Sequence, residues 1–352
     1  MRKILAVLGL LASIVPAPGS AADLRKVAIN FGLTYVPVGN GPVFSVPQAM
    51  GFWKEEGLDV QVQLANGSGT AMQQLIAGQV AGSVGGVPPA MTLINKGAPI
   101  ITAASINSRN VYYPVVLETS AIKTIADMKG AKVGIVSAAS SNVYWIKSML
   151  QKHGLDPEKD ITLVSVGSGP AALQALTSGR IDVLQLFEAA YDQIELSGTK
   201  LRRFDHDPDF NSLAFTLGMV VRLDTFSNDP DVLVRVLRGI AKGIVYAKAH
   251  PEDAVRMHWK VYPLAKPQGV SDEQALANDV VIIKSALKNH AWIDQKKFGY
   301  EKAESVIAIR DVLKQFGELD TALPPERYFD PKLVDKINDF DQAEVAVRKP
   351  AL

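Results

Sequence analysis

The chain has 352 residues, of which 47% are hydrophobic and 21% charged, so it is typical of a globular protein and not of a disordered one. Its 37 Lys and Arg residues balance 36 Asp and Glu, which argues against long-range attraction to nucleic acid or to an anionic membrane. Cysteine is absent, which excludes a disulfide framework and a lipid anchor on a cysteine.

The first 22 residues have the pattern of a cleavable signal peptide. Arg2 and Lys3 precede an apolar run over 4–15, and small residues occupy 20–22. The run is shorter than the roughly 20 residues that a permanent membrane helix needs. We therefore expect export to the periplasm and a soluble mature chain that starts near Asp23, long enough for two domains.

Strands and helices alternate through the first part of the mature chain. The first group comprises predicted strands over 26–31, 58–64, 80–84, 100–106 and 113–118, with helices over 43–54 and 88–96. The second comprises strands over 132–136, 161–166, 183–186 and 213–221, with a helix over 142–153. The pattern then becomes helical, over 230–250, 272–289 and 300–316.

Two segments about a hundred residues apart read almost alike, which is the strongest indication of architecture. Each has a β-type run, a glycine-rich turn, a short helix, a glycine stop and another strand. The turns are 67–70 and 167–170; the candidate helix N-caps are Ser68 or Thr70 and Ser168; and the glycines after the helices are Gly78 and Gly179. Such a unit implies a parallel sheet, and two copies imply two similar lobes.

The predicted fold class is α/β, with two Rossmann-like lobes around a central cleft. Residues 23–116 and 217–352 would form lobe I, and 117–216 lobe II. The chain would cross between them near Leu117 and again near Phe215. Two crossover strands permit hinge closure around a ligand.

Five ordered strings carry a resemblance to a known family: 49–60, 67–70, 85–89, 127–134 and 179–182. Together they resemble the periplasmic solute-binding proteins of ATP-driven (ABC) importers for aliphatic sulfonates, taurine, nitrate and thiamine pyrimidine precursors. The resemblance runs from about Val27 to Phe226. It implies a type II periplasmic-binding fold that hands an unaltered ligand to an inner-membrane ABC permease.

Candidate ligand contacts in lobe I lie in loops that follow predicted strands. Tyr35 belongs to the first loop, whose glycines and prolines are also explained as turn residues. The second loop supplies a helix start suited to an oxyanion, although helix capping alone also explains its hydroxyls. The third loop has two adjacent glycines, which either let the backbone approach a ligand closely or simply form a tight turn. The candidates in the second and third loops are Ser68, Gly69, Thr70, Gly86 and Val87.

The second lobe offers another helix start rich in hydroxyls, expected to face Ser68 across the cleft. Its candidates are Ser137, Ser140, Ser141 and Asn142. Phe187 and Glu188 follow the strand after the second repeat, where Glu188 either accepts hydrogen bonds from a ligand amine or begins a helix.

Three further candidates follow the strand over 100–106. They are Asn107, Arg109 and Tyr112. Arg109 suits a carboxylate or sulfonate, although an arginine in such a loop is more often a surface residue. Together the candidates favour a small organic anion or a compound with an aromatic ring or an amine.

No nucleophile motif, metal-type cluster or P-loop is evident, so we expect no enzyme activity, no metal and no cofactor. The family also includes a thiamine-pyrimidine synthase, but its cysteine-rich stretch has no counterpart here. A periplasmic enzyme of the same fold, or a sensory binding subunit without transport, is the alternative. The expected partners are a small-molecule ligand and an ABC permease, without nucleic acid, and the chain should be a monomer.

Overall fold

The computed structural model describes residues 23–350 except 206, 212, 291 and 294–296. The predicted signal peptide therefore lies outside the described residues. In the part of the chain that is described, no helix combines the length and the apolar character needed to cross a membrane.

The first of two five-stranded sheets holds the N-terminal strands. They are β1 (Arg25–Phe31), β2 (Leu58–Leu64), β3 (Gly82–Gly86), β4 (Ile100–Ser105) and β10 (Leu217–Arg222), in the order β2-β1-β3-β10-β4. Strand β1 is parallel to β2 and β3, whereas β10 is antiparallel to β3 and β4. Helices α3 (Ser68–Ile76) and α4 (Val87–Asn95) connect strands of this sheet.

The second sheet repeats this plan. It contains β5 (Pro114–Leu117), β6 (Lys132–Ile135), β7 (Thr162–Ser165), β8 (Val183–Gln185) and β9 (Leu201–Arg203), in the order β7-β6-β8-β5-β9. Strand β6 is parallel to β7 and β8, and β5 is antiparallel to β8 and β9. Its helices are α5 (Ser141–Lys152), α6 (Pro170–Thr177), α7 (Glu188–Leu196) and α8 (Pro208–Asn211).

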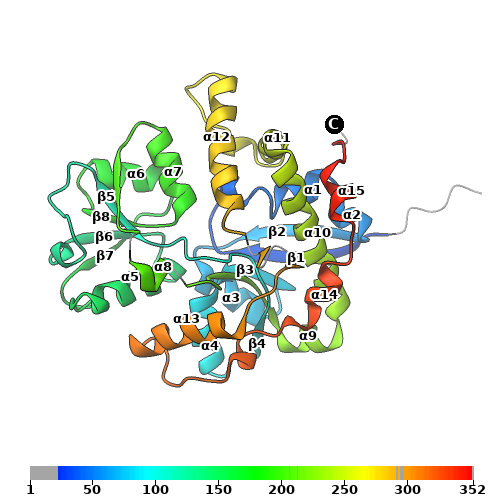
Figure 1. The fold of residues 1–352 in the computed structure, drawn as a ribbon, viewed down its shortest axis with the longest axis horizontal. Coiled ribbons are helices and arrows are strands. Elements are labelled where there is room, and N and C mark those ends of the chain that lie inside the picture. The colour runs from blue at the N-terminus through cyan, green and yellow to red at the C-terminus, as the bar shows by residue number, and fades with distance from the viewer. Residues whose placement is uncertain (1–22, 206, 212, 291, 294–296, 351–352) are drawn as a thin grey trace, which may run out of the picture.

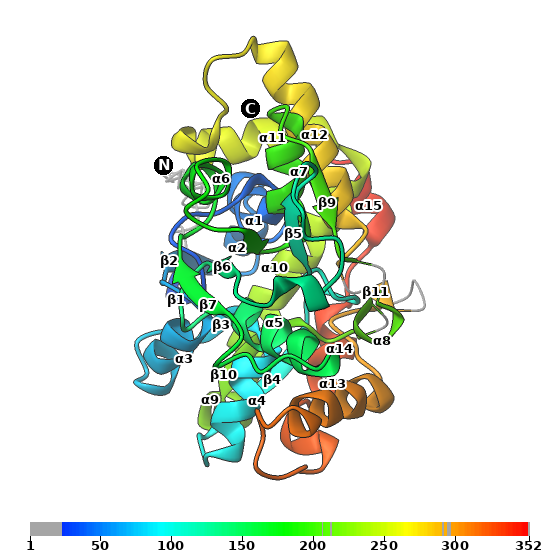
Figure 2. The same cartoon turned by 90° about the vertical axis from the view of Figure 1, so that its left-hand side faces the viewer.

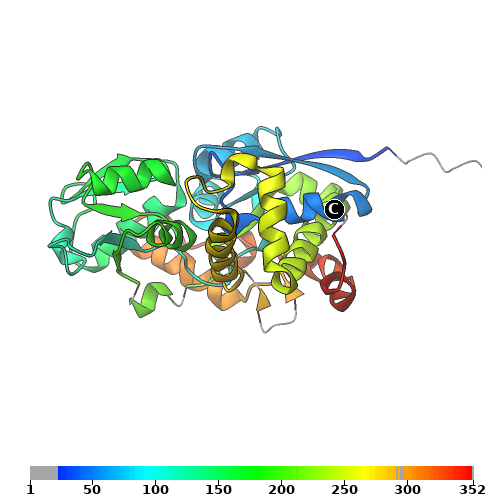
Figure 3. The same ribbon diagram turned by 90° about the horizontal axis from the view of Figure 1, so that it is seen from above.

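Each sheet therefore has one antiparallel strand, in the fourth position, that the chain adds as it passes between lobes. Figures 1 and 3 show the two α/β lobes side by side, with α5, α6 and α7 in one and α10 in the other. This confirms the predicted fold class of two Rossmann-like lobes with two crossover strands. Strand β5 joins the second sheet from Pro114 onward, slightly before the predicted crossing near Leu117.

The helix starts of the two repeats differ from the prediction. The residue that precedes α3 is Gly67 and the one that precedes α6 is Gly169, with φ angles of 99° and 67°. Glycine adopts these left-handed conformations without the steric cost of a side chain. The prediction of Ser68, Thr70 and Ser168 as N-caps was therefore wrong.

The predicted helix over 43–54 is divided into α1 (Ser45–Ala49) and α2 (Phe52–Glu55). Gly51 lies between them with a φ of 75°, which ends the first helix.

Helices of the C-terminal part complete the first lobe. They are α9 (Leu223–Asn228), α10 (Pro230–Ala249), α11 (Pro251–Val261), α12 (Asp272–Leu287), α13 (Ala303–Gln315), α14 (Val334–Ile337) and α15 (Gln342–Ala346), with a hairpin of β11 (Trp292–Ile293) and β12 (Lys297–Phe298). Short 3₁₀ turns cover Val38–Asn40, Ala126–Met128, Pro263–Ala265, Pro325–Arg327 and Pro331–Leu333.

Helix α10 is the central element of this lobe. Leu237, Ile240 and Ile244 are fully buried along it. Gly239 lets the helix approach Trp53, because a Cβ at that position would lie 2.2 Å from Cδ1 of the indole. The indole N–H of Trp53 donates to the Val236 carbonyl at 3.0 Å, which fixes α2 against α10.

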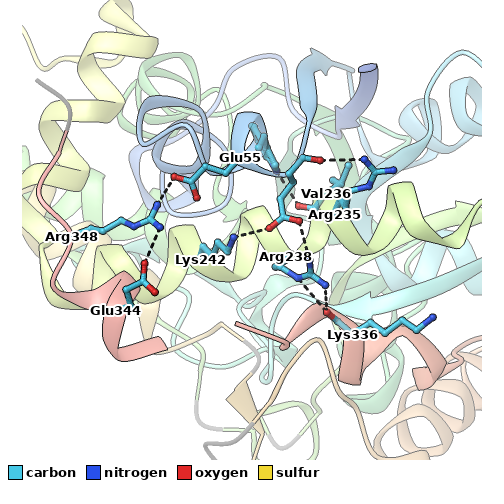
Figure 4. Close-up of polar contacts among 10 residues, drawn as sticks. Glu55, Arg235, Val236, Arg238, Lys242, Lys336, Glu344 and Arg348 are labelled. Atoms are coloured by element: carbon cyan, nitrogen blue, oxygen red, sulfur yellow. Dashed lines mark hydrogen bonds and ion pairs between the residues drawn. The ribbon is translucent and has the colours of Figure 1, made fainter. Parts of the chain in front are cut away.

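Ion pairs attach the end of α2 to α10 and to the C-terminal segment (Figure 4). Glu56 is nearly buried and accepts from Lys242 Nζ at 2.6 Å and from Arg238 Nη1 at 2.9 Å. Arg348 pairs with Glu344 at 3.3 Å and also with Glu55. The contacts around Glu56 are more protected from solvent than those of Arg348, so removing one partner there should cost more stability than removing Glu344.

Candidate functional site

A small cavity lies between the two lobes, where β1, β3 and β6 end. Its volume is about 80 Å³. It is lined by Phe31, Gly32, Leu33, Asn40, Ser68, Val84, Gly85, Asn107, Val111, Tyr112, Val136, Ser140, Ser141, Asn142, Phe187 and Leu217. Both lobes contribute, as expected for a site at the carboxyl ends of parallel strands.

The starts of α3 and α5 meet in this cavity. Ser141 Oγ donates to Ser68 Oγ at 2.9 Å, and the same Ser68 oxygen accepts the Gly86 N–H at 3.1 Å. Both serines are buried, with exposed fractions of 7% for Ser68 and 3% for Ser141. The two helix starts therefore face each other across the lobes, as the sequence predicts.

Glycines allow the lobes to approach this closely. A Cβ at Gly86 would lie 1.7 Å from Ser141 Oγ and 2.4 Å from Ser141 Cβ. On the other side of the contact, the Gly69 N–H donates to the Ala139 carbonyl at 2.8 Å. Ser137 Oγ also donates across the lobes, to the Asn66 carbonyl at 3.2 Å.

The electrostatic character of the cavity comes from helix ends. Residues at the starts of α3 and α5 line it, and so does Phe187, the residue that precedes α7. The start of a helix carries partial positive charge and unpaired N–H groups, which favour an oxyanion. The lining residues include no charged side chain.

An aromatic wall borders the polar helix starts. The Tyr112 ring stacks on Trp145 with centroids 6.2 Å apart and an interplanar angle of 11°. Burial raises the pKa of Tyr112 to about 12, although a hydrogen bond with Ser141 opposes this shift. Tyr112 thus remains neutral at physiological pH, and it presents, together with Phe187, surfaces suited to the apolar part of a ligand.

The side-chain amides of Asn142 and Gln185 add polar groups at and near the cavity. Asn142 donates from Nδ2 to the Gln185 carbonyl, whereas its buried Oδ1 has no hydrogen-bond partner in the part of the chain that the structure describes. The side-chain amide of Gln185, at the end of β8 and behind the cavity lining, is also buried, and neither polar atom has a partner among the described residues. Buried polar groups normally find partners, so these amides are candidates for contact with a bound solute.

Seven of the predicted contact residues line the cavity: Ser68, Asn107, Tyr112, Ser140, Ser141, Asn142 and Phe187. The other eight do not. Gly69, Gly86 and Ser137 lie at the contact between the lobes, Val87 is fully buried in α4, and Thr70 is exposed. Tyr35 lines a different cleft, described below.

Arg109 and Glu188 bind each other outside the cavity lining. Arg109 Nη2 lies 2.9 Å from Glu188 Oε2, and Arg109 Nε also donates to Asn289 Oδ1. Asn289 in turn donates to Glu188 Oε2 at 2.7 Å. Since Glu188 begins α7 and Asn289 follows α12, this triad connects the second lobe with the C-terminal helices.

No sequence motif marked the apolar part of the lining or Gln185 as candidates for the site. Phe31, Leu33, Val84, Val111, Val136 and Leu217 lie within or next to strands that read as ordinary core. Gln185 had a detectable signal, because it is a polar residue inside the short apolar run over 183–186.

Two α/β lobes that are joined by crossover strands and enclose a cavity at their strand ends define the type II fold of periplasmic solute-binding proteins. The chain belongs to the NMT1/THI5-like family, whose model matches residues 43–254.

Known proteins of this kind show the same fold at low sequence identity. A protein of Bordetella bronchiseptica RB50 has 21% identity and a TM-score of 0.74, covering 90% of this chain and 98% of the other. The alkanesulfonate-binding protein SsuA of Xanthomonas axonopodis pv. citri, solved bound to MOPS, has 14% identity and a TM-score of 0.65, covering 88% and 99%.

A similar protein from Saccharomyces cerevisiae is named as an enzyme. The 4-amino-5-hydroxymethyl-2-methylpyrimidine phosphate synthase THI13 is 24% identical over 305 residues, which cover 82% of this chain and 86% of the yeast protein.

Proposed function

We propose that this protein is the periplasmic solute-binding component of an ABC importer and delivers an unmodified small solute to a membrane permease. The observation that carries the proposal is the meeting of two helix starts from opposite lobes, through Ser68 and Ser141, inside a cavity between the lobes. The family and the fold support the same general role.

The solute we propose has a polar oxyanion or carbonyl head and a flat apolar body. The serine hydroxyls and backbone N–H groups at the starts of α3 and α5 would bind the head. Tyr112 and Phe187 would contact the body, and the free Asn142 oxygen would accept a hydrogen bond from it. Sulfonates, aromatic carboxylates and pyrimidines meet this description.

The cavity must open to admit such a solute, because its present volume of about 80 Å³ holds little more than the head group. The Arg109–Glu188–Asn289 triad would then stabilise the closed arrangement without contact to the solute. This role replaces the direct ligand contact that the sequence suggested for Arg109 and Glu188.

Thermal-shift screening of sulfonates, aromatic carboxylates and pyrimidines, followed by calorimetric titration, tests the proposal. A bound solute at 100 times its dissociation constant adds about 2.7 kcal/mol of stability. Loss of one hydrogen bond to a charged head in Ser141→Ala should weaken binding by about 1.5–3 kcal/mol. Ser165→Ala, on an exposed strand position, is the matched control and should bind normally.

Recovery of the solute after incubation separates a binding protein from an enzyme. We expect it to be recovered unchanged, at stoichiometric amounts. Catalytic consumption of the solute would contradict the proposal and favour an activity of the kind that THI13 is named for.

A further inference from the structure

A second and larger cleft lies between the lobes and is lined by residues of α6, α7 and α12. Figure 2 shows these three helices at the same end of the molecule. It consists of two adjoining chambers of about 740 and 300 Å³, which share Gly169, Pro170, Gln193, Pro267, Gln268 and Asp279. The larger chamber has the size of typical small-molecule sites. It shares no lining residue with the first cavity.

Exposed apolar side chains gather at this cleft. Four of the nine exposed large apolar residues in the described chain line it: Leu64, Leu196, Leu264 and Val270. Single exposed apolar residues need no explanation, but a concentration of them around a concave surface is typical of a binding site.

One buried carboxylate lies in the wall of both chambers. Asp279 has an exposed fraction of 2%, and its Oδ2 accepts the Trp259 indole N–H at 2.8 Å. No ion pair joins Asp279 to a described residue. The cation in the lining, Lys266, binds Asp272 at 2.8 Å and lies 5.2 Å above the Trp259 ring.

A buried carboxylate without a cation is unusual, because desolvation of the charge is costly unless a partner compensates it. Burial raises the pKa of Asp279 to about 6, so the group is still ionised above neutral pH. A cation from outside the chain would relieve this cost. Tyr35 and Tyr262 line the same chamber and offer aromatic faces that attract cations.

We propose that this second cleft binds a small apolar compound carrying an ammonium group, with the ammonium at Asp279 and the apolar body among Leu173, Ile194 and Val270. The site is separate from the cavity of the proposed function, and the inference goes beyond that function. An ammonium at Asp279 would share the carboxylate with the Trp259 indole N–H, which already donates to Oδ2.

Titration of the mature chain with 2-phenylethylamine at pH 8, followed by NMR of the indole N–H signals, tests the proposal. The Trp259 signal reports the second cleft because its N–H binds Asp279, and the Trp145 signal reports the first cavity because its ring stacks on Tyr112. We expect the Trp259 signal to shift and the Trp145 signal to remain. No shift at millimolar amine, or a shift of Trp145 alone, would overturn the proposal.

Two variants and an uncharged compound test whether the Asp279 carboxylate binds the ammonium group. Asp279→Asn should weaken 2-phenylethylamine binding at least tenfold, whereas Asp272→Asn, an exposed carboxylate on the same helix, should change it less than twofold. 2-Phenylethanol, similar in shape but uncharged, should bind at least tenfold more weakly than the amine to the unaltered chain. Equal affinity of the amine for Asp279→Asn and the parent, or of the two compounds for the parent, would contradict the assignment.

Discussion

The two clefts between the lobes differ in how the lobes meet there. At the first cavity, Ser141 bonds to Ser68 and Gly69 to Ala139, so the lobes touch through direct hydrogen bonds around a small volume. At the second, the walls stand apart around about 740 Å³ lined largely by apolar groups and one carboxylate. The same two lobes thus form a tight site where they touch directly and a wider, more apolar one where they stand apart.

The largest expected effect comes from blocking the first contact with Gly86→Ala. The backbone at Gly86 has φ −64°, so alanine is tolerated there, but its Cβ would collide with Ser141. Closure would be prevented, and we expect solute binding to weaken about 100-fold or more, as for severe overpacking. Calorimetric titration measures the loss.

Removing the colliding side chain should restore closure. In the Gly86→Ala/Ser141→Gly double variant, small-angle scattering should again show contraction on addition of solute, although affinity remains below that of the parent. A double variant as unresponsive as the single one would indicate that Gly86 acts through something other than this contact.

The buried Asp279 in the second cleft should make the free energy of unfolding depend on pH. The pKa of Asp279 is about 6 in the folded chain, above the ordinary value of 3.8, so its protonated form favours folding. This contribution is complete below pH 3.8 and is lost as the pH rises through 6. Relative to Asp279→Asn, the parent should therefore lose on the order of 2 kcal/mol of unfolding free energy between pH 4 and 8.

Urea unfolding at both pH values measures this difference, with Asp272→Asn as the exposed control. A parent chain and an Asp279→Asn variant with parallel pH profiles would show that Asp279 is not desolvated.

A smaller effect is expected from the triad that joins the lobes beside the first cavity. Glu188→Gln removes the ion pair with Arg109. The Arg109 side chain is 46% exposed to solvent, which weakens the pair. Such a pair is worth at most about 1 kcal/mol, so solute affinity should fall roughly three- to fivefold, less so at high salt.

The Arg109→Gln/Glu188→Gln double variant distinguishes a closing contact from a solute contact. If the two residues act on closure through each other, the double variant should bind no more weakly than either single one. Additive losses would instead support separate contacts with the solute.

The smallest effect is expected at Thr70, which the sequence pattern places beside Ser68. Its side chain is exposed and donates to the Asn66 carbonyl at 3.1 Å, away from the cavity lining. Thr70→Ala should change solute affinity less than twofold in the same titration. A tenfold loss would extend the first site beyond its present lining.

The fold was largely predictable because local patterns determine it. Alternating strands and helices, two similar glycine turns and a returning strand over 213–221 indicated two similar α/β lobes. The helix start at Ser68 followed from the first repeat, and the one near Ser141 followed from the predicted strand over 132–136 that precedes it. The exact N-cap residues were less predictable, because Gly67 and Gly169 occupy the N-cap positions of α3 and α6, which hydroxyl residues usually take.

The remaining features depend on contacts between distant segments. The pairing of Arg109 with Glu188 and Asn289 joins three parts of the chain, and no local pattern specifies it. The second cleft likewise combines residues near Tyr35, Ser168 and Lys266 with α12, whose polar Asp279 reads as an ordinary helix residue.

The structure of a complex with a solute found by screening tests the central claim most directly. We predict that the solute lies between the lobes, with its polar head within hydrogen-bond distance of both the Ser68 and Ser141 hydroxyls. A solute bound elsewhere, with the two serines still bonded to each other, would contradict the account.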